Sequence, residues 1–281
     1  MYPYEIFLGL DLYSILLCVG IFVCILTYSR LADTLYLSAK LQKFCFICAV
    51  FAIPLGYGSA VLFQALYNIK ENGGFVLSKD TGATFYGGLI GGAAVFLLIY
   101  FVAGHFLFSD GYHRRNFFGV ANCAAASIAL AHACGRVGCL MAGCCHGKLT
   151  EEWYGIYMHG DFGYEKYVPV QLFEALFLFA LFGILTALVL KKGSYNLPIY
   201  MMGYGAWRFV AEYFRADDRG DSLISFLSPS QLIAVLMILG GVGLLVFERY
   251  YERKHATEIV REANEIKQRR EKTDTNGETK K

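Results

Sequence analysis

The sequence is poor in charge. Only 17% of the 281 residues are charged, whereas 56% are hydrophobic, and soluble domains carry about 25% charged residues. The charged residues are also bunched together, so long stretches have none. A helix of about 20 apolar residues is long enough to cross a bilayer. The composition therefore argues against a soluble domain and indicates an integral membrane protein.

Three other features are absent. No segment alternates apolar and polar residues in the way that a membrane barrel requires. The first apolar run lacks a basic start and a small-residue cleavage site, so we expect a retained span and not a signal peptide. The sequence contains no internal repeat that would indicate a second domain. An all-α membrane protein is the fold class that remains.

Seven runs are apolar enough to be spans. They are Leu10–Tyr28, Phe44–Leu66, Phe85–Phe106, Phe117–Cys134, Val170–Leu190, Leu197–Phe214 and Gln231–Phe247. The fourth and sixth are weaker, because small or polar residues dilute them. We predict a seven-helix membrane domain over residues 1–247 and a charged tail over residues 248–281.

The distribution of lysine and arginine predicts the orientation. The tail is rich in basic residues, so the C-terminus is expected in the cytoplasm and the N-terminus outside. The tail's mixed charges favour a solvated helix, with a lipid-surface clamp as the minor alternative and with the final TDTNGETKK disordered. The stretch GRVGCLMAGCCHGK, residues 135–148, then follows the fourth span at the outer face.

The sixth span carries charges inside an apolar run. Tyr204, Arg208, Glu212 and Arg215 share one face of a helix by their spacing. Ionisable residues within a membrane span are costly and usually face a cavity or a partner. One interpretation is an ion-pair ladder that only holds helices together, and the other is a functional site.

A third arginine comes from residues 135–148. Together with Arg208 and Arg215, Arg136 suits an anion, because guanidinium groups match phosphate oxygens two at a time. Lipid phosphate is the most plentiful anion at a membrane, so a phospholipid is the natural ligand. Alternatively, Arg136 only extends to the interface.

Small residues open the third span, FYGGLIGG. Gly87 and Gly91, like Gly88 and Gly92, are four apart, which permits close packing of helices and also leaves room for a bulky ligand. Tyr86, just before them, is either an interfacial tyrosine or a hydroxyl in the site.

The fifth span begins with PVQLFEA. Gln171 and Glu174 fall in its first turns, where the helix dipole favours a carboxylate. They either cap the helix or orient other polar groups.

These motifs, YGAWRFVAEYFRADD, FYGGLIGG, GRVGC…AGCC.G and PVQLFEA, resemble those of the prolipoprotein diacylglyceryl transferase family. The resemblance covers most of residues 10–247. It implies transfer of the diacylglyceryl group of phosphatidylglycerol to the lipobox cysteine thiol of a preprolipoprotein, with release of glycerol phosphate. It also implies a bacterial plasma membrane protein whose site faces the outer leaflet.

The resemblance assigns residues to roles. It implies catalytic roles for Arg208, Glu212, Tyr86 and His132, and substrate-binding roles for Arg136, Gly143, Tyr204, Gly87, Gly88, Gln171 and Glu174. The expected partners are phosphatidylglycerol, signal peptides of preprolipoproteins and the lipid bilayer. We expect no cofactor, no metal and no nucleic acid.

The chain departs from the family pattern at several positions. Tyr86 stands where the family usually has histidine, and Cys139, Ala142 and Cys144 replace two asparagines and a glutamate. The general base could therefore be Tyr86, His132 or His146. Two alternative functions also remain: a transferase with a different acceptor, and a non-catalytic lipid- or metal-binding protein.

Nine cysteines are present. We expect five of them to be core residues of the spans: Cys18, Cys24, Cys45, Cys48 and Cys123. Three hypotheses fit the outer set of Cys134, Cys139, Cys144, Cys145 and His146. The preferred one is a packed or disulfide-linked loop outside the reducing cytosol. The others are a zinc site, although paired CxxC motifs are absent there, and a reactive thiol beside Arg136.

Overall fold

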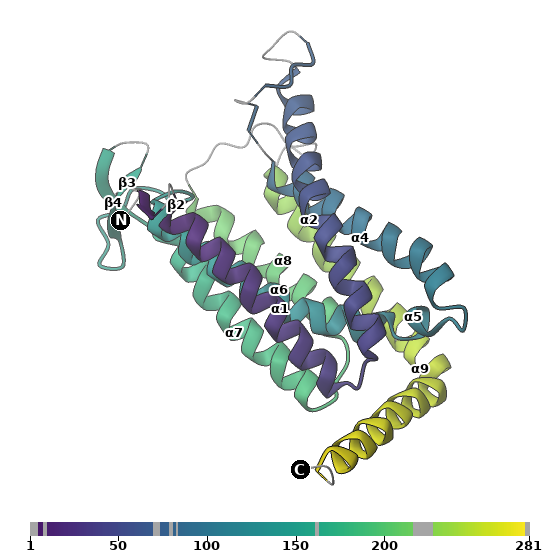
Figure 1. The fold of residues 1–281 in the computed structure, drawn as a ribbon. Coiled ribbons are helices and arrows are strands. Elements are labelled where there is room, and N and C mark those ends of the chain that lie inside the picture. Colours follow the sequence, from purple (N-terminus) through teal and green to yellow (C-terminus); the bar gives the residue numbers. More distant parts are fainter. Residues whose placement is uncertain are drawn as a thin grey trace. The chain divides into compact units, whose positions relative to one another are not determined.

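The fold is mainly helical and divides into two compact units (Figure 1). The computed structural model describes residues 5–7, 10–69, 74–78, 81–82, 84–160, 163–215 and 227–278. The first unit comprises residues 1–36 and 118–264, and the second comprises residues 37–117 and 265–281.

The first unit contains most of the helices. Its elements are β1 (Glu5–Phe7), β2 (Leu10–Asp11), α1 (Leu12–Thr34), α6 (Phe117–Ala142), β3 (Ile156–Gly160), β4 (Gly163–Tyr167), α7 (Val170–Leu190), α8 (Asn196–Ala211), the 3-10 helix η1 (Glu212–Phe214) and most of α9 (Pro229–Glu278). Asp11 begins α1 by accepting a hydrogen bond from the Ser14 amide at 2.8 Å, as an N-cap residue does. Hydrogen bonding to Ser14 also holds the pKa of Asp11 below its ordinary value.

The second unit pairs α2 (Ala39–Tyr67) with α4 (Phe85–Leu107), followed by the short α5 (Tyr112–Arg115). Glycines bring the two long helices together. A Cβ on Gly56 would lie 3.0 Å from Gly92 Cα, and a Cβ on Gly87 would lie 2.6 Å from Phe63 Cβ. Ser59 Oγ donates a hydrogen bond to the Gly87 carbonyl at 2.9 Å. The predicted close packing through these glycines is confirmed.

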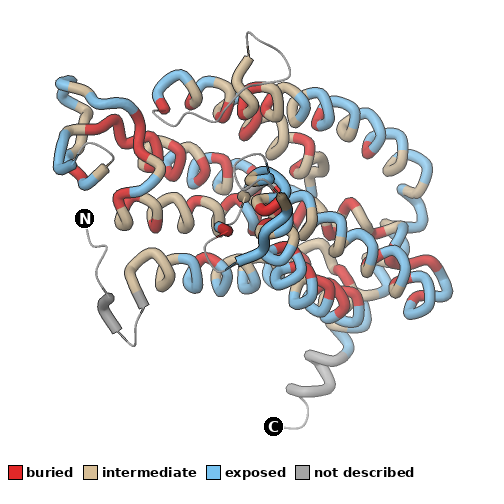
Figure 2. Tube along the Cα trace, turned by 90° about the horizontal axis from the view of Figure 1, so that it is seen from above, coloured by how far each residue is buried: buried red, intermediate tan, exposed pale blue. Residues whose placement is uncertain are grey.

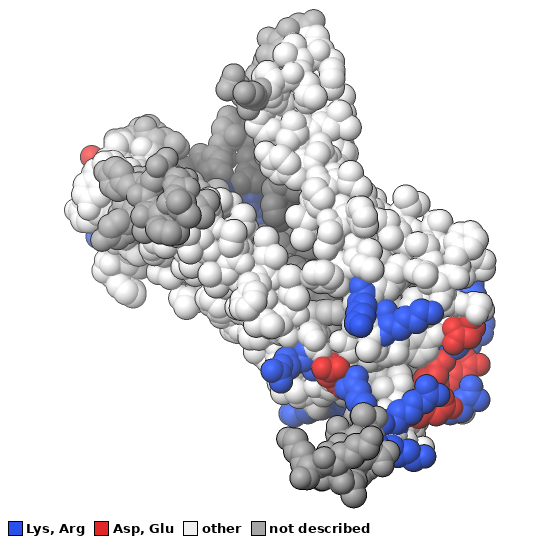
Figure 3. All heavy atoms as spheres, viewed as in Figure 1, with Lys and Arg blue, Asp and Glu red and all other residues white. Residues whose placement is uncertain are grey.

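Among the residues that the structure describes, six helices are long and apolar enough to cross a membrane. They are Leu12–Thr34, Ala39–Tyr67, Gly87–Leu107, Phe117–Ala142, Val170–Leu190 and Pro229–Lys272. Many large apolar side chains are exposed, for example Phe22 and Ile53, and Figure 2 shows that exposed positions recur along the helices. On the face drawn in Figure 3, long stretches of helix surface carry no charged residue. These features fit a multi-pass membrane protein.

The sixth predicted span differs from the expectation. Instead of one helix over Leu197–Phe214, the structure has the 16-residue α8 and then η1, and α8 is not among the six long apolar helices. A count of seven spans and the orientation of the termini therefore stay predictions.

Two predicted boundaries were wrong. The fourth span was expected to end at Cys134, but α6 continues to Ala142, so Arg136 lies on a helix and not in a loop. The tail was expected to become disordered at Thr273, whereas α9 passes residue 247 without a break and ends at Glu278. Residues 279–281 lie outside the described part, and the division at residue 247 stays a prediction.

The hairpin formed by β3 and β4 was not predicted from the sequence. Strands β3 and β4 pair antiparallel, with Ile156 opposite Tyr167 and Gly160 opposite Gly163. The hairpin lies between α6 and α7 in the chain, and Tyr167 is fully buried. It packs Met158 and Tyr167 against Leu140 near the end of α6, so it supports the helix that carries Arg136.

Candidate active site

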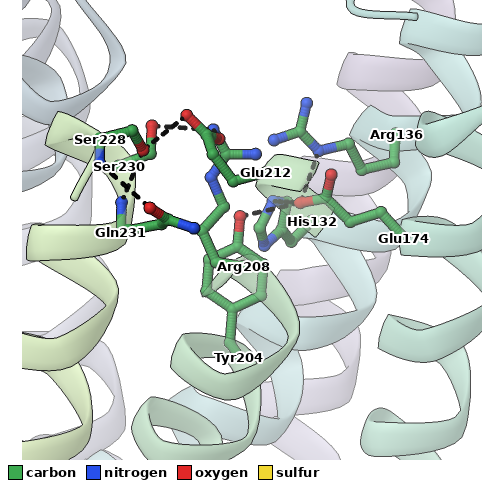
Figure 4. A network of polar contacts seen from close by, with 9 residues as sticks. All are labelled: His132, Arg136, Glu174, Tyr204, Arg208, Glu212, Ser228, Ser230 and Gln231. Carbon is green, nitrogen blue, oxygen red and sulfur yellow. Dashed lines mark hydrogen bonds and ion pairs between the residues drawn. The ribbon is translucent and has the colours of Figure 1, made fainter. Parts of the chain in front are cut away.

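Glu174, in the second turn of α7, is the centre of a buried polar network. Its Oε1 accepts a hydrogen bond from the Tyr204 hydroxyl at 2.8 Å and lies 3.0 Å from Arg136 Nε (Figure 4). The Glu174 side chain is fully buried, and that of Arg136 is 15% exposed. A buried charge is costly unless it is paired. The pair therefore explains how an arginine can lie this deep.

His132 lies one helical turn before Arg136 and joins the same network. Its Nε2 is 3.8 Å from Glu174 Oε1, and its Nδ1 is 3.2 Å from the Tyr200 hydroxyl. Its ring packs edge-on against Tyr204, with ring centroids 4.8 Å apart. His132 and Arg136 therefore share one partner, Glu174. We call Glu174, Arg136, Tyr204 and His132 the Glu174 network.

A second arginine–carboxylate pair lies on α8 and η1. Arg208 Nη2 is 3.1 Å from Glu212 Oε2 and donates to Ser230 Oγ at 3.1 Å. Ser228 Oγ donates to Glu212 Oε1 at 3.0 Å. The Arg208 and Glu212 side chains are only 5% and 10% exposed. The predicted Arg208–Glu212 pair is confirmed, and with Ser228 and Ser230 it forms the Arg208 cluster.

The serines of the Arg208 cluster were not predicted, although the sequence held a signal. The segment SPSQ at the start of α9 is a capping box, in which a serine and a glutamine three residues later bond each other's backbone. The Ser228 amide donates to Gln231 Oε1 at 3.1 Å, and the Gln231 amide donates to Ser228 Oγ at 3.2 Å. This cap fixes the start of α9 against Glu212.

The arginines keep donors to spare. Arg208 Nη1 and Glu174 Oε2 are buried and make no hydrogen bond within the described residues. Figure 4 shows the Arg136 and Arg208 side chains on either side of the Tyr204 hydroxyl. Each arginine is held by one carboxylate, so its remaining N–H groups are fixed in direction. Such an arrangement suits an oxyanion such as phosphate.

The sequence was compared with models of known protein families. The family model for prolipoprotein diacylglyceryl transferase matches residues 4–247. That range includes both arginine–carboxylate pairs. The chain belongs to the prolipoprotein diacylglyceryl transferase family.

Curated relatives agree with this family. Phosphatidylglycerol–prolipoprotein diacylglyceryl transferase 2 of Clostridium perfringens (strain 13 / Type A) is 32% identical over 191 residues, which are 65% of this chain and 70% of that protein. A relative from Bordetella parapertussis is 32% identical over 71% of this chain and 74% of its own length. One from Dehalococcoides mccartyi (strain CBDB1) is 30% identical over 75% and 79%. Both are named phosphatidylglycerol–prolipoprotein diacylglyceryl transferase.

Most of the site residues that the family resemblance implied lie together. The two groups of contacts contain His132, Arg136, Glu174, Tyr204, Arg208 and Glu212. Arg215, expected on the same helix face, departs from it. The helix ends before Arg215, whose backbone is extended at φ −81° and ψ 151° and forms a bridge with Gly147.

Gln171, Gly143 and His146 lie in or near the segment that follows α6. Gln171 is fully buried, and its Nε2 donates to the Cys144 carbonyl at 3.0 Å, so it positions the segment after α6. Gly143 follows α6 in the left-handed region at φ +76°, where glycine is favoured. His146, one of the possible bases, is buried with its ring 4.1 Å from that of Tyr167.

Three predicted family residues belong to the second unit. Gly87 and Gly88 face α2, since a Cβ on Gly88 would lie 3.3 Å from Ala60 Cβ. Their substrate-binding role stays a prediction, because the contacts that the structure describes explain them through packing alone. The side chain of Tyr86 lies outside the described part of the structure.

The cysteines after Arg136 form no disulfide, which excludes the disulfide-linked form of the expected packed or disulfide-linked loop. Cys134, Cys139, Cys144 and Cys145 are all free thiols. The Sγ atoms of Cys139, Cys144 and Cys145 instead lie within 4.8 Å of one another; we call these three residues the thiol cluster. Hydrogen bonds from Cys139 and Cys144, with smaller effects of Arg215 and Arg136, lower the pKa of Cys145. The hydrogen bonds that Cys144 donates to Cys139 and Cys145 raise the pKa of Cys144.

Proposed function

We propose that this chain transfers the diacylglyceryl group of phosphatidylglycerol to the lipobox cysteine thiol of a preprolipoprotein and releases glycerol phosphate. The observation that carries the proposal is the pair of buried arginines, each fixed by a carboxylate, in a chain of this family. The relatives' names state the donor lipid and the acceptor protein, and the arginines supply the chemistry that the donor needs.

Arg136 and Arg208 bind the phosphate of the lipid. Arg208 Nη1 has no partner among the described residues, and the Arg136 side chain is partly exposed. Glu174 and Glu212 are positioning residues that fix the two guanidinium groups. Because an apolar environment strengthens these interactions, preorganised donors there stabilise the charge that develops on the leaving group.

The reaction is a substitution at carbon. The acceptor sulfur, as thiolate, attacks the glyceryl carbon that bears the phosphate. A carbon–sulfur bond forms, the carbon–oxygen bond breaks, and the electron pair leaves with the oxygen of glycerol phosphate. Among the possible bases, His132 lies in the Glu174 network, where Tyr200 and Glu174 orient its ring. It can therefore accept the thiol proton during the attack.

The site faces the outer leaflet in this proposal. The basic residues after residue 247 favour a cytoplasmic C-terminus and an external N-terminus, which places the end of α6 at the outer face. Phosphatidylglycerol then enters from the bilayer, and the signal peptide presents its lipobox cysteine at the same level.

The test is a reconstituted assay with a choice of donors. Purified protein in liposomes is given a lipobox peptide and either phosphatidylglycerol or phosphatidylethanolamine, and peptide masses are recorded. We expect a diacylglyceryl adduct with phosphatidylglycerol and none on a peptide with serine in place of cysteine. An equal yield from both lipids would contradict the donor assignment, and no adduct under any condition would contradict the transferase assignment.

A further inference from the structure

The thiol cluster has the composition and spacing of a zinc site. Zinc binds thiolates at about 2.3 Å, so the sulfurs of a tetrahedral site lie about 3.8 Å apart. The three Sγ atoms already lie within 4.8 Å of one another.

The backbone around the thiol cluster is held in an uncommon conformation. Cys145 has a positive φ of +61°, a conformation that is unfavourable for a non-glycine residue and is often found at functional sites. Gly143, two residues earlier, has φ +76°. These two turns bring Cys144 and Cys145 back toward Cys139 on the last part of α6.

Neighbouring elements anchor the thiol cluster beside the Glu174 network. Gln171 on α7 donates to the Cys144 carbonyl at 3.0 Å, and Glu174 follows one turn later on the same helix. Cys139 lies one turn after Arg136 on α6. Arg215 pairs through its backbone with Gly147, two residues after Cys145. Two cations therefore offset part of the negative charge that three thiolates would bring.

Three protein ligands leave one position of a tetrahedral zinc ion open, as in catalytic zinc sites. Cys144 is exposed, so the cluster is accessible to another molecule. The reaction proposed above requires a thiolate, and a thiol that coordinates a metal ion loses its proton outright.

We propose that Cys139, Cys144 and Cys145 bind one zinc ion as thiolates and that the open position receives the acceptor cysteine. Only the assignment of the open position to the acceptor cysteine rests on the proposed function; the zinc site itself does not. Coordination would lower the pKa of the acceptor thiol, and its proton then passes to His132, the base proposed above. The coordinated sulfur then forms the bond to the glyceryl carbon as the carbon–oxygen bond to phosphate breaks, and the resulting thioether, a weaker ligand, dissociates.

Cobalt substitution tests the metal site without using activity. The reduced protein in detergent is titrated with Co²⁺, and the thiolate-to-metal absorption in the near ultraviolet is recorded. We expect one Co²⁺ per chain, displaced by Zn²⁺. The signal should disappear in a Cys139→Ser/Cys144→Ser/Cys145→Ser variant and persist in Cys134→Ser, which removes a thiol outside the cluster. No absorption, or equal absorption in the triple variant, would overturn the site.

The same cobalt protein tests the open position. A lipobox peptide should raise the thiolate absorption by about a third, because a fourth thiolate joins three, and a peptide with serine at the acceptor position should not. No rise with the cysteine peptide would overturn the acceptor assignment and leave the metal site standing. Full transferase activity in the metal-free protein would have the same meaning. A metal site in a chain without transferase activity would instead count against the proposed function.

Discussion

Arg136 Nε and Glu174 Oε1 lie 3.0 Å apart and join α6 to α7 inside an apolar bundle. Neither charge would be stable alone in this buried position, because an unpaired buried charge costs several kcal/mol. The same Glu174 oxygen accepts the Tyr204 hydroxyl from α8 at 2.8 Å. One carboxylate on α7 therefore fixes groups from two other helices, and removing its charge should lower both stability and turnover.

Glu174→Gln tests this pair. The variant keeps the shape of the side chain and removes its charge, which leaves Arg136 without compensation. We expect a lower thermal midpoint and a fall in kcat of about tenfold or more, since breaking a buried pair costs about 3–5 kcal/mol. Thermal unfolding in detergent and the peptide assay measure the two effects. Glu165→Gln, at an exposed position of β4, is the matched control. A wild-type kcat in Glu174→Gln would remove Glu174 from the site.

Arg136→Lys tests whether the phosphate contact needs a guanidinium group. Lysine keeps the charge but is a compact point charge without the planar fork. We expect most of the activity to be lost, with KM for phosphatidylglycerol raised. Arg249→Lys, at an exposed position of α9, should behave like the wild type. If Arg136→Lys is equally active, Arg136 supplies only charge.

Arg208→Ala and Glu212→Ala test the second pair. Each variant should still insert into membranes and should lose turnover, because the 3.1 Å ion pair fixes the guanidinium. The double variant should lose no more than about one further factor of two to three, since residues in one network are not additive. Losses that multiply fully in the double variant would mean that the two residues act independently.

A polar cluster away from the arginines should affect stability alone. Asn122 Nδ2 donates to Glu248 Oε1 at 2.7 Å, and the Tyr195 amide donates to the same oxygen at 3.2 Å. Glu248 is fully buried. Glu248→Ala leaves these donors unsatisfied at about 1–3 kcal/mol, so the thermal midpoint should fall while kcat per folded protein stays unchanged. Exposed Glu152 provides the control Glu152→Ala. A loss of kcat without a loss of stability would give Glu248 a role in turnover.

Helix type and most of the spans could be predicted from the sequence, because long apolar runs leave the chain few alternatives. The boundaries could not. Small residues weaken the apolar signal after Cys134, yet α6 continues to Ala142 and brings Arg136 to Glu174, a partner about forty residues away in the chain. The change from α8 to η1 at Glu212 moved Arg215 off the predicted face.

In the candidate site, too, contacts within one helix could be predicted, whereas contacts between helices could not. Arg208 and Glu212 are four residues apart on one helix, so their pairing could be predicted from spacing. The role of Glu174 as the common partner of Arg136, Tyr204 and His132 depends on the packing of three helices and was not predictable from spacing. The convergence of Cys139 with Cys144 and Cys145 needed the two left-handed residues that follow α6.

The most direct measurement counts both products of the reaction. Protein in phosphatidylglycerol liposomes is incubated with the lipobox peptide, and mass spectrometry quantifies the modified peptide and the released glycerol phosphate, in the wild type and in an Arg136→Ala/Arg208→Ala variant. We expect one glycerol phosphate for each thioether-linked diacylglyceryl peptide in the wild type, and neither product in the variant. Modified peptide without glycerol phosphate, or equal yields from the variant, would contradict the assignment of the two arginines to the leaving phosphate.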